Sequence, residues 1–268
     1  MSDILDKIVA QKRKEVARNK TLYPEALLEK TIYFETPTVS LAKYLLRPDK
    51  SGIIAEFKRK SPSKGFINPY AQVEEVSIGY MQAGASALSV LTDQEFFGGS
   101  NADLTTARNF NFCPILRKDF TIDPYQIIEA KSIGADAILL IAEVLSMDEV
   151  KDLAGRAKSL GLEVLLEMHG EEQLDKICDE IDVVGINNRN LKTFVTSIES
   201  SENLYPLLPR EKVKISESGI SDPQTVGHLR TVGYQGFLIG EQFMKHPEPA
   251  KACNRFIQQI SGAKNQLA

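Results

Sequence analysis

Eight short apolar runs, separated by segments of helical character, constrain the fold of this chain more than any other feature. They occupy residues 53–57, 87–91, 114–116, 137–141, 164–168, 183–186, 213–215 and 237–239. A polar or glycine-containing loop follows each run, as expected for parallel strands that are buried on both faces. Residues typical of helix starts and ends lie between the runs: Asp123-Pro124, Ser146, Asp222-Pro223, Gly84, Gly134 and Gly161. Eight such units without a long interruption predict an α/β protein with a closed (β/α)8 TIM barrel.

The composition is that of an ordinary globular protein. The 268 residues suit one such barrel, and 43% of them are hydrophobic while 25% are charged. The 32 lysines and arginines nearly balance the 36 acidic residues, which argues against nucleic acid as the main partner. No stretch approaches the ~20 apolar residues of a membrane span, and the N-terminus lacks the pattern of a secretion signal. We therefore expect a cytoplasmic protein that binds neither nucleic acid nor membrane.

The sequence offers little to a metal ion or a dinucleotide cofactor. No G-x-G-x-x-G follows the first run, so the usual dinucleotide-binding signature is missing. The few cysteines and histidines are scattered without metal-ligand spacing: Cys113, Cys178, Cys253, His169, His228 and His246. We expect no metal site and no cofactor.

The first 48 residues differ from the remainder, and we assign residues 1–48 to an N-terminal helical extension and 49–268 to the barrel. Apolar residues recur there at helical spacing: Ile4, Leu5, Ile8, Val9 and Val16. Basic residues lie between them: Lys7, Lys12, Arg13, Lys14 and Arg18. The pattern predicts an amphipathic helix that covers one end of the barrel and turns a basic face to solvent. Alternatively, this face adds positive potential near an anionic ligand.

Charged and polar residues end five of the eight runs, where the active site of a parallel barrel lies. Glu56 and Lys58 are two residues apart, so both side chains face the same side of the first strand. The other run ends are Arg117-Lys118-Asp119, Glu167-Met168-His169, Asn187-Asn188-Arg189 and Ser216-Glu217-Ser218. Each group alone could be a solvated charge or an ion pair at the barrel mouth. Together they favour a catalytic site.

Other loop residues suit the two ends of a phosphorylated ligand. Gly219 and Gly240 follow the last two runs, where loops of phosphate-binding barrels cradle the anion, although both could simply close tight turns. The basic loop 59–65 is either a mobile flap or an exposed loop. Several apolar residues could line a pocket for a flat ring: Pro62, Phe97, Phe120, Leu139 and Leu191.

These motifs resemble a known family. Residues 55–65 (AEFKRKSPSKG) are similar to the signature of indole-3-glycerol phosphate synthases of tryptophan biosynthesis. The motifs at 116–120, 167–169, 186–191 and 216–220 follow in the family's order, and residues 4–16 also match. The resemblance implies a carboxy-lyase that closes 1-(2-carboxyphenylamino)-1-deoxyribulose 5-phosphate to indole-3-glycerol phosphate, with loss of carbon dioxide and water. It implies no cofactor, and it suggests association with other tryptophan-pathway enzymes as a partner hypothesis.

The resemblance also implies roles for individual residues. Lys118 is the general acid of ring closure, held by Glu56 beside Phe120, while Lys58 contacts the anthranilate carboxylate. The dehydration uses Lys58 or Glu167, and the resemblance leaves this choice open. Three residues would bind sugar hydroxyls: Asn187, Glu217 and Ser218. Four would hold the phosphate: Ser61, Arg189, Gly219 and Gly240. Glu241, beside Gly240, would shape the same end of the pocket.

Three other functions are compatible with such a barrel. A Schiff-base aldolase would use Lys118 or Lys58 as its nucleophile. A sugar-phosphate isomerase would share the phosphate loops but would lack the Ser-Pro-Ser loop. A binding protein without activity would have no need of two lysines and Glu167 at one mouth.

Overall fold

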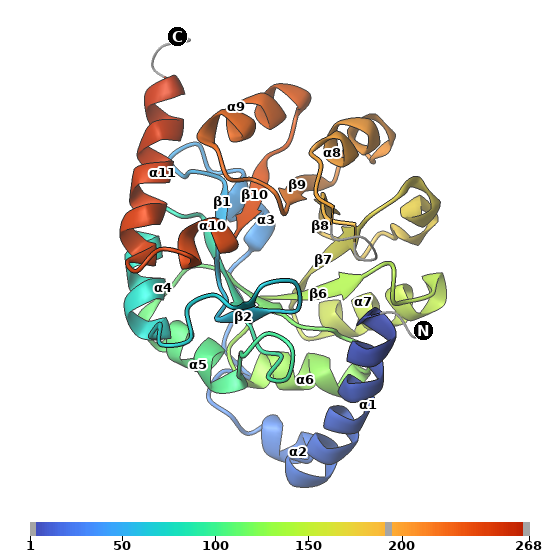
Figure 1. The fold of residues 1–268 in the computed structure, drawn as a ribbon. Helices are drawn as coiled ribbons and strands as arrows, with labels where there is room; N and C mark the ends of the chain where they lie inside the picture. The colour runs from blue at the N-terminus through green and yellow to red at the C-terminus, as the bar shows by residue number, and fades with distance from the viewer. Residues whose placement is uncertain (1–3, 191–194, 265–268) are drawn as a thin grey trace.

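The computed structural model describes residues 4–190 and 195–264. Eight parallel strands form its centre: β1 Ile53–Phe57, β4 Ala87–Leu91, β5 Ile115–Lys118, β6 Ala137–Ile141, β7 Glu163–Met168, β8 Val183–Asn187, β9 Val213–Glu217 and β10 Gly236–Ile239. They close into one barrel in the order β1, β10, β9, β8, β7, β6, β5, β4 (Figure 1). Each predicted apolar run forms one strand, and the (β/α)8 barrel is confirmed.

Helices surround this barrel (Figure 1). They are α1 Ile4–Leu22, α2 Glu25–Leu28, α3 Leu41–Leu45, α4 Val73–Gln82, α5 Asn101–Phe110, α6 Pro124–Ser132, α7 Met147–Ser159, α8 Glu199–Leu204, α9 Pro223–Val232, α10 Glu241–Met244 and α11 Pro249–Lys264. Short 3-10 helices span Glu171–Lys176 and Tyr205–Leu207, and the loop after β1 contains a small hairpin of β2 Lys60–Ser61 and β3 Gly65–Phe66. No helix in the described part of the chain is long and apolar enough to cross a membrane.

The helix boundaries follow the punctuation in the sequence. The side chains of Asp123 and Asp222 accept backbone N–H bonds at the starts of α6 and α9, with proline at the first helical position. Ser146 starts α7 in a reciprocal capping box with Glu149. Gly134, at a φ of 93°, ends the turn after α6, as predicted from its place before a strand. Local sequence therefore sets where these elements begin and end.

Two apolar layers pack on the strands. Alternate strand residues such as Ile54 and Leu165 point inward and form an inner cluster, while a larger cluster fills the space between strands and helices. Leu41 and Leu45 of α3 join the inner cluster, and the Ala42 N–H donates to Glu163 at the start of β7 (2.8 Å). Helix α3 therefore closes the N-terminal end of the barrel and leaves the other end for a site.

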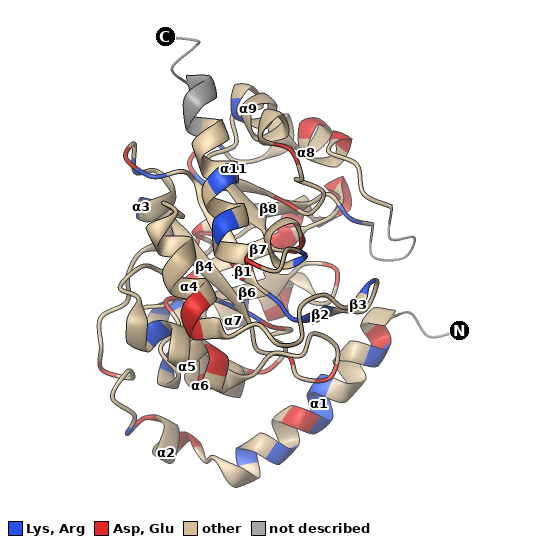
Figure 2. Ribbon diagram, turned by 60° about the vertical axis from the view of Figure 1, so that its left-hand side comes forward, with Lys and Arg blue, Asp and Glu red and all other residues tan. Residues whose placement is uncertain are grey.

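The N-terminal helix α1 is present, and Lys7, Arg13, Lys14 and Arg18 are exposed as the amphipathic pattern predicts, whereas Lys12 is buried. Leu5, Ile8 and Val16 are buried, and basic residues outnumber the acidic Asp6 and Glu15 along the helix (Figure 2). Lys12 is not on the solvated face, because its side chain is only 1% exposed. The prediction of Lys12 as a solvent-facing charge is therefore wrong: three carboxylates surround its ammonium group and compensate its burial.

Candidate active site

A cavity opens at the carboxyl ends of the strands, with a second hollow beside it. Candidate residues line the first: Glu56, Lys58, Ser61, Pro62, Phe97, Lys118, Phe120, Leu139, Glu167, Asn187, Arg189, Glu217 and Ser218. The adjoining hollow shares Arg189 and Ser218 and adds Gly219, Gly240 and Glu241. Leu191, the remaining candidate, lies outside the described residues. The fold thus brings the other candidates, from distant parts of the sequence, to one end of the barrel.

Lys118 lies between two buried carboxylates inside the cavity. Its Nζ atom is 2.6 Å from Glu167 Oε2 on β7 and 2.9 Å from Glu217 Oε2 on β9. Glu56 is not its direct partner, contrary to expectation, and pairs instead with Lys58 at 2.8 Å. The reason is local geometry: Glu56 and Lys58 share one side of the same strand, while Lys118 reaches across the barrel from β5.

These three charges set one another's protonation. Burial disfavours the ammonium form of Lys118, but the carboxylates of Glu167 and Glu217 outweigh burial and hold its pKa well above the usual range. Burial opposes the ionised form of Glu167 as well, yet Lys118 lowers the pKa of this carboxyl to about 2. Burial, reinforced by the charge of Glu167, raises the pKa of Glu217 to about 7 against the pull of Lys118. One lysine therefore holds one carboxylate firmly ionised and leaves the other able to titrate near neutrality.

Asn187 joins Glu167 to the segment that carries Arg189. Its Nδ2 atom donates to Glu167 Oε1 (3.0 Å), and its Oδ1 accepts the Arg189 N–H (3.0 Å). The His169 Nε2 atom lies 3.6 Å from the same Glu167 oxygen. Asn187 therefore fixes both the orientation of the Glu167 carboxylate and the backbone that carries Arg189.

Arg189 lies at the opening between the cavity and the hollow. Its guanidinium contacts Ser63 of the β1 loop (3.1 Å) and Glu241 (3.4 Å). Among the described residues, its buried Nε atom and the buried Ser61 hydroxyl have no hydrogen-bond partner. Buried donors without partners are costly, so an anion that accepts from both would be bound favourably.

Near Arg189, two glycines let the backbone come close to neighbouring groups. Gly219 has a φ of 72°, and Gly240 precedes the short helix α10. A Cβ atom at Gly240 would lie 2.6 Å from Glu56 Oε1, so this glycine also makes room for Glu56. Gly185 on β8 has a similar role that sequence analysis missed, since a Cβ there would lie 2.2 Å from Glu217 Oε1. A glycine inside a strand was the available signal.

The opposite end of the cavity is apolar. The Phe97 and Phe120 ring centroids lie 6.1 Å apart, and Leu139 and Pro62 line the same space. Sequence analysis missed further apolar lining residues: Ile4, Leu5 and Ile8 of α1, Leu91, Ile141 and Leu238. The apolar face of the predicted amphipathic helix was a signal for the first three. This end suits a flat apolar group.

The basic loop after β1 is partly fastened to the barrel. The Arg59 guanidinium pairs with Asp103 (2.7 Å) and lies over the Phe57 ring (4.7 Å to its centroid). Lys60 donates to the Glu95 carbonyl (2.8 Å). The loop therefore places Ser61 and Pro62 over the cavity through defined contacts.

Three ionisable groups in contact, Lys118, Glu167 and Glu217, lie inside a cavity that has an apolar end and, among the described residues, an end with unsatisfied donors. Fold and site together define a TIM-barrel enzyme of acid–base type that acts on a small anionic molecule.

Residues 5–256 match the family model described as "Indole-3-glycerol phosphate synthase". The chain therefore belongs to the indole-3-glycerol phosphate synthase family, carboxy-lyases of tryptophan biosynthesis. It is 52% identical to the indole-3-glycerol phosphate synthase of Bacteroides thetaiotaomicron, across 97% of this chain and 100% of that protein. Identity with the same enzyme of Dechloromonas aromatica is 43%, across 96% and 100% of the two chains.

Solved structures of similar fold are more distant. A tryptophan synthase complex from Pyrococcus furiosus matches with a TM-score of 0.59 and 16% identity, covering 80% of this chain and 99% of that one. KGPDC from Streptococcus mutans matches with a TM-score of 0.60 and 13% identity, covering 78% and 97%. At this identity the likeness concerns the barrel fold.

Proposed function

We propose that this chain closes 1-(2-carboxyphenylamino)-1-deoxyribulose 5-phosphate to indole-3-glycerol phosphate, releasing carbon dioxide and water. The observation that carries the proposal is Lys118, held charged between Glu167 and Glu217 in a cavity that is also lined by the aromatic wall of Phe97 and Phe120 and by Arg189. The substrate has the matching groups: an aromatic acid, a carbonyl with hydroxyls, and a phosphate.

Ring closure is the step that needs Lys118. Because carbon dioxide leaves, the attacking atom is the ring carbon that bears the carboxylate, and it bonds to the carbonyl carbon of the sugar chain. The carbonyl oxygen becomes an alkoxide, a stronger base than an amine. Lys118 gives it a proton even with a raised pKa. Loss of carbon dioxide then returns the bonding electrons to the ring.

The dehydration needs an acid and a base at different atoms. We assign the acid to Lys58, whose ammonium group is held by Glu56 and delivers a proton to the departing hydroxyl. We assign the base to Glu167, whose low pKa keeps it ionised and which removes the proton lost when the five-membered ring becomes aromatic. Release of one water molecule and no net change in protons completes the step.

Binding and orientation fall to the surrounding residues. Asn187, Ser218 and Glu217 face the middle of the cavity, and the buried Glu217 Oε1 atom has no partner within the described chain, so it suits a sugar hydroxyl. Ser61 and Arg189 offer unsatisfied donors to the phosphate, aided by the backbone at Gly219 and Gly240. Phe97, Phe120, Pro62 and Leu139 hold the aromatic ring.

The electrostatics argue against the aldolase alternative at Lys118. A Schiff base forms only from a neutral amine, and two carboxylates keep this lysine charged. We also propose a cytoplasmic location, which the sparse, unpaired cysteines support.

The test mixes purified protein with the synthetic substrate and follows indole fluorescence and carbon dioxide release together. We expect both signals to rise with the wild type. Lys118→Ala should abolish turnover by a factor of roughly 10³ or more, while the substrate still binds, because the lost group acts only in the transition state. Turnover retained by Lys118→Ala would remove its assignment as the acid, and silence of the folded wild type would remove the proposed reaction.

A further inference from the structure

A buried lysine of the N-terminal helix joins the two loops that carry the aromatic wall. The Lys12 Nζ atom lies 2.9 Å from Asp93 Oδ2 and 2.9 Å from Asp119 Oδ1. Asp119 directly follows β5, Asp93 lies two residues after the end of β4, and the side chains of all three residues are 1% exposed. Glu15, one turn further along α1, completes the shell at 3.0 Å. One ammonium group therefore bridges the ends of two adjacent strands.

Each aspartate also accepts hydrogen bonds from the backbone of nearby phenylalanines. Asp93 Oδ1 accepts the backbone N–H groups of Phe96 (2.8 Å) and Phe97 (3.3 Å). Asp119 Oδ1 accepts the N–H of Phe120 (2.8 Å). Phe97 and Phe120 are the paired rings of the cavity wall. The backbone N–H groups of Phe97 and Phe120 are thus each linked to Lys12 through one aspartate.

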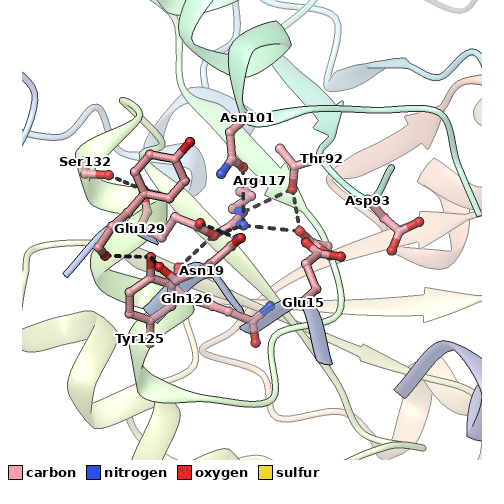
Figure 3. A network of polar contacts seen from close by, with 12 residues as sticks. Glu15, Asn19, Thr92, Asp93, Asn101, Arg117, Tyr125, Gln126, Glu129 and Ser132 are labelled. Carbon is pink, nitrogen blue, oxygen red and sulfur yellow. Dashed lines mark hydrogen bonds and ion pairs between the residues drawn. The ribbon is translucent and has the colours of Figure 1, made fainter. Parts of the chain in front are cut away.

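A second set of contacts, around Arg117, links the end of β5 to α6 and α1; Figure 3 shows Thr92, Arg117, Glu129 and Asn19 of this set. Asp119 Oδ2 accepts from Thr92 (2.6 Å) and pairs with Arg117 (3.2 Å). Arg117 pairs in turn with Glu129 of α6, which accepts a bond from Asn19 of α1 (3.1 Å). Thr92 and the strand backbone also join the two segments, but among the described residues Lys12 is the cation that the salt bridges place against both Asp93 and Asp119. Without that ammonium group, the two buried carboxylates would repel each other.

We propose that Lys12 is a positioning residue that sets the spacing of Phe97 and Phe120, and thereby the recognition of the aromatic half of the substrate. The same helix lines the cavity with Ile4, Leu5 and Ile8, so its docking through Lys12 completes the apolar end. The inference rests on the proposed function for the identity of the aromatic group, an anthranilate. It assigns Lys12 no contact with the reacting atoms.

The experiment compares two ligands, one for each end of the site. Anthranilate binding is followed by its own fluorescence, which is unobstructed because the chain has no tryptophan. Inorganic phosphate binding is measured by calorimetry. We expect Lys12→Met to weaken anthranilate binding by roughly tenfold or more and to leave phosphate binding within about twofold, because only the aromatic wall shifts.

Lys20→Met is the matched control. Lys20 lies on the same helix, and its exposed ion pair with Asp123 (2.9 Å) is remote from the phenylalanines. We expect this variant to bind both ligands as the wild type does. If Lys12→Met does not fold, Asp93→Asn replaces it, since it removes one ion pair but keeps an oxygen acceptor for Phe97. It should give a smaller loss confined to anthranilate.

Equal losses for both ligands, or none for anthranilate, would overturn the inference, as would a wild type that does not bind anthranilate. The proposed function fails separately, when the folded wild type does not turn over the full substrate. Turnover of the full substrate adds a further check: Lys12→Met should raise KM more than it lowers kcat.

Discussion

The contacts of Arg189 leave part of its guanidinium group available to a ligand. Its pairs with Ser63 and Glu241 are partly exposed, and its Nε atom has no partner among the described residues. We expect Arg189→Ala to raise KM by roughly 10–100-fold with little change in kcat, because phosphate binding is alike in ground and transition states. Steady-state kinetics with the full substrate measures this. Arg47→Ala, which removes an exposed pair with Asp49, is the control, and a loss confined to kcat would contradict the phosphate role.

At this scale, sequence predicted which side chains reach the barrel mouth but not how they pair. Strand ends place Glu56, Lys118, Glu167 and Glu217 there by simple alternation. The partner of Lys118 depends on distances across the closed barrel, which no local pattern contains. The burial of Lys12 was missed for a related reason: its compensating carboxylates, Asp93 and Asp119, follow strands far away in sequence.

Among the elements, α7 tests how much local capping contributes to stability. Ser146 Oγ accepts the Glu149 N–H (3.3 Å), and Glu149 Oε2 accepts the Ser146 N–H (2.8 Å). We expect Ser146→Ala to lower the free energy of unfolding by about 1 kcal/mol, because one helix N–H loses its partner. Activity should be unchanged, since neither residue lines the cavity. Denaturant unfolding measures the loss, and Ser159→Ala at the other end of α7 should stay within about 0.5 kcal/mol of wild type.

The strands show where element prediction succeeds and where it stops. All eight were predicted from apolar runs, but three run ends were placed too early, at 116, 186 and 215. The structure extends β5 to Lys118, β8 to Asn187 and β9 to Glu217. In each case the last strand residue is a polar residue that lines the cavity: Lys118, Asn187 or Glu217. At these three strands the hydrophobic pattern ends before the strand does, because the strand's last residue is a polar group of the cavity.

For the whole molecule, the charges that suit catalysis make stability depend on pH. Folding raises the pKa of Glu217 from an ordinary value of 4.5 to about 7, so the folded protein holds this proton more tightly than the unfolded chain. The stabilisation is complete below about pH 4.5 and is lost as the pH rises through 7. Glu167 acts oppositely, since its pKa of about 2 gives stabilisation above pH 4.5 that is lost only in strong acid. Between pH 5 and 8, the change in stability that this pair causes therefore comes from Glu217.

Glu217→Gln separates this effect from the rest of the protein. At pH 8 the wild type holds two buried carboxylates against one Lys118 ammonium, whereas the variant holds one, so its Tm should exceed that of the wild type. At pH 5 wild-type Glu217 is protonated and resembles the amide, so the two Tm values should converge. The full pKa difference corresponds to roughly 3 kcal/mol, an upper value since the cavity relaxes. Thermal melts at both pH values, with exposed Glu211→Gln as control, measure the difference. A gap in Tm that stayed constant with pH would exclude titration of Glu217 as its cause, whereas a gap that opens above neutrality would tie the stability of the fold to the carboxylate pair around Lys118.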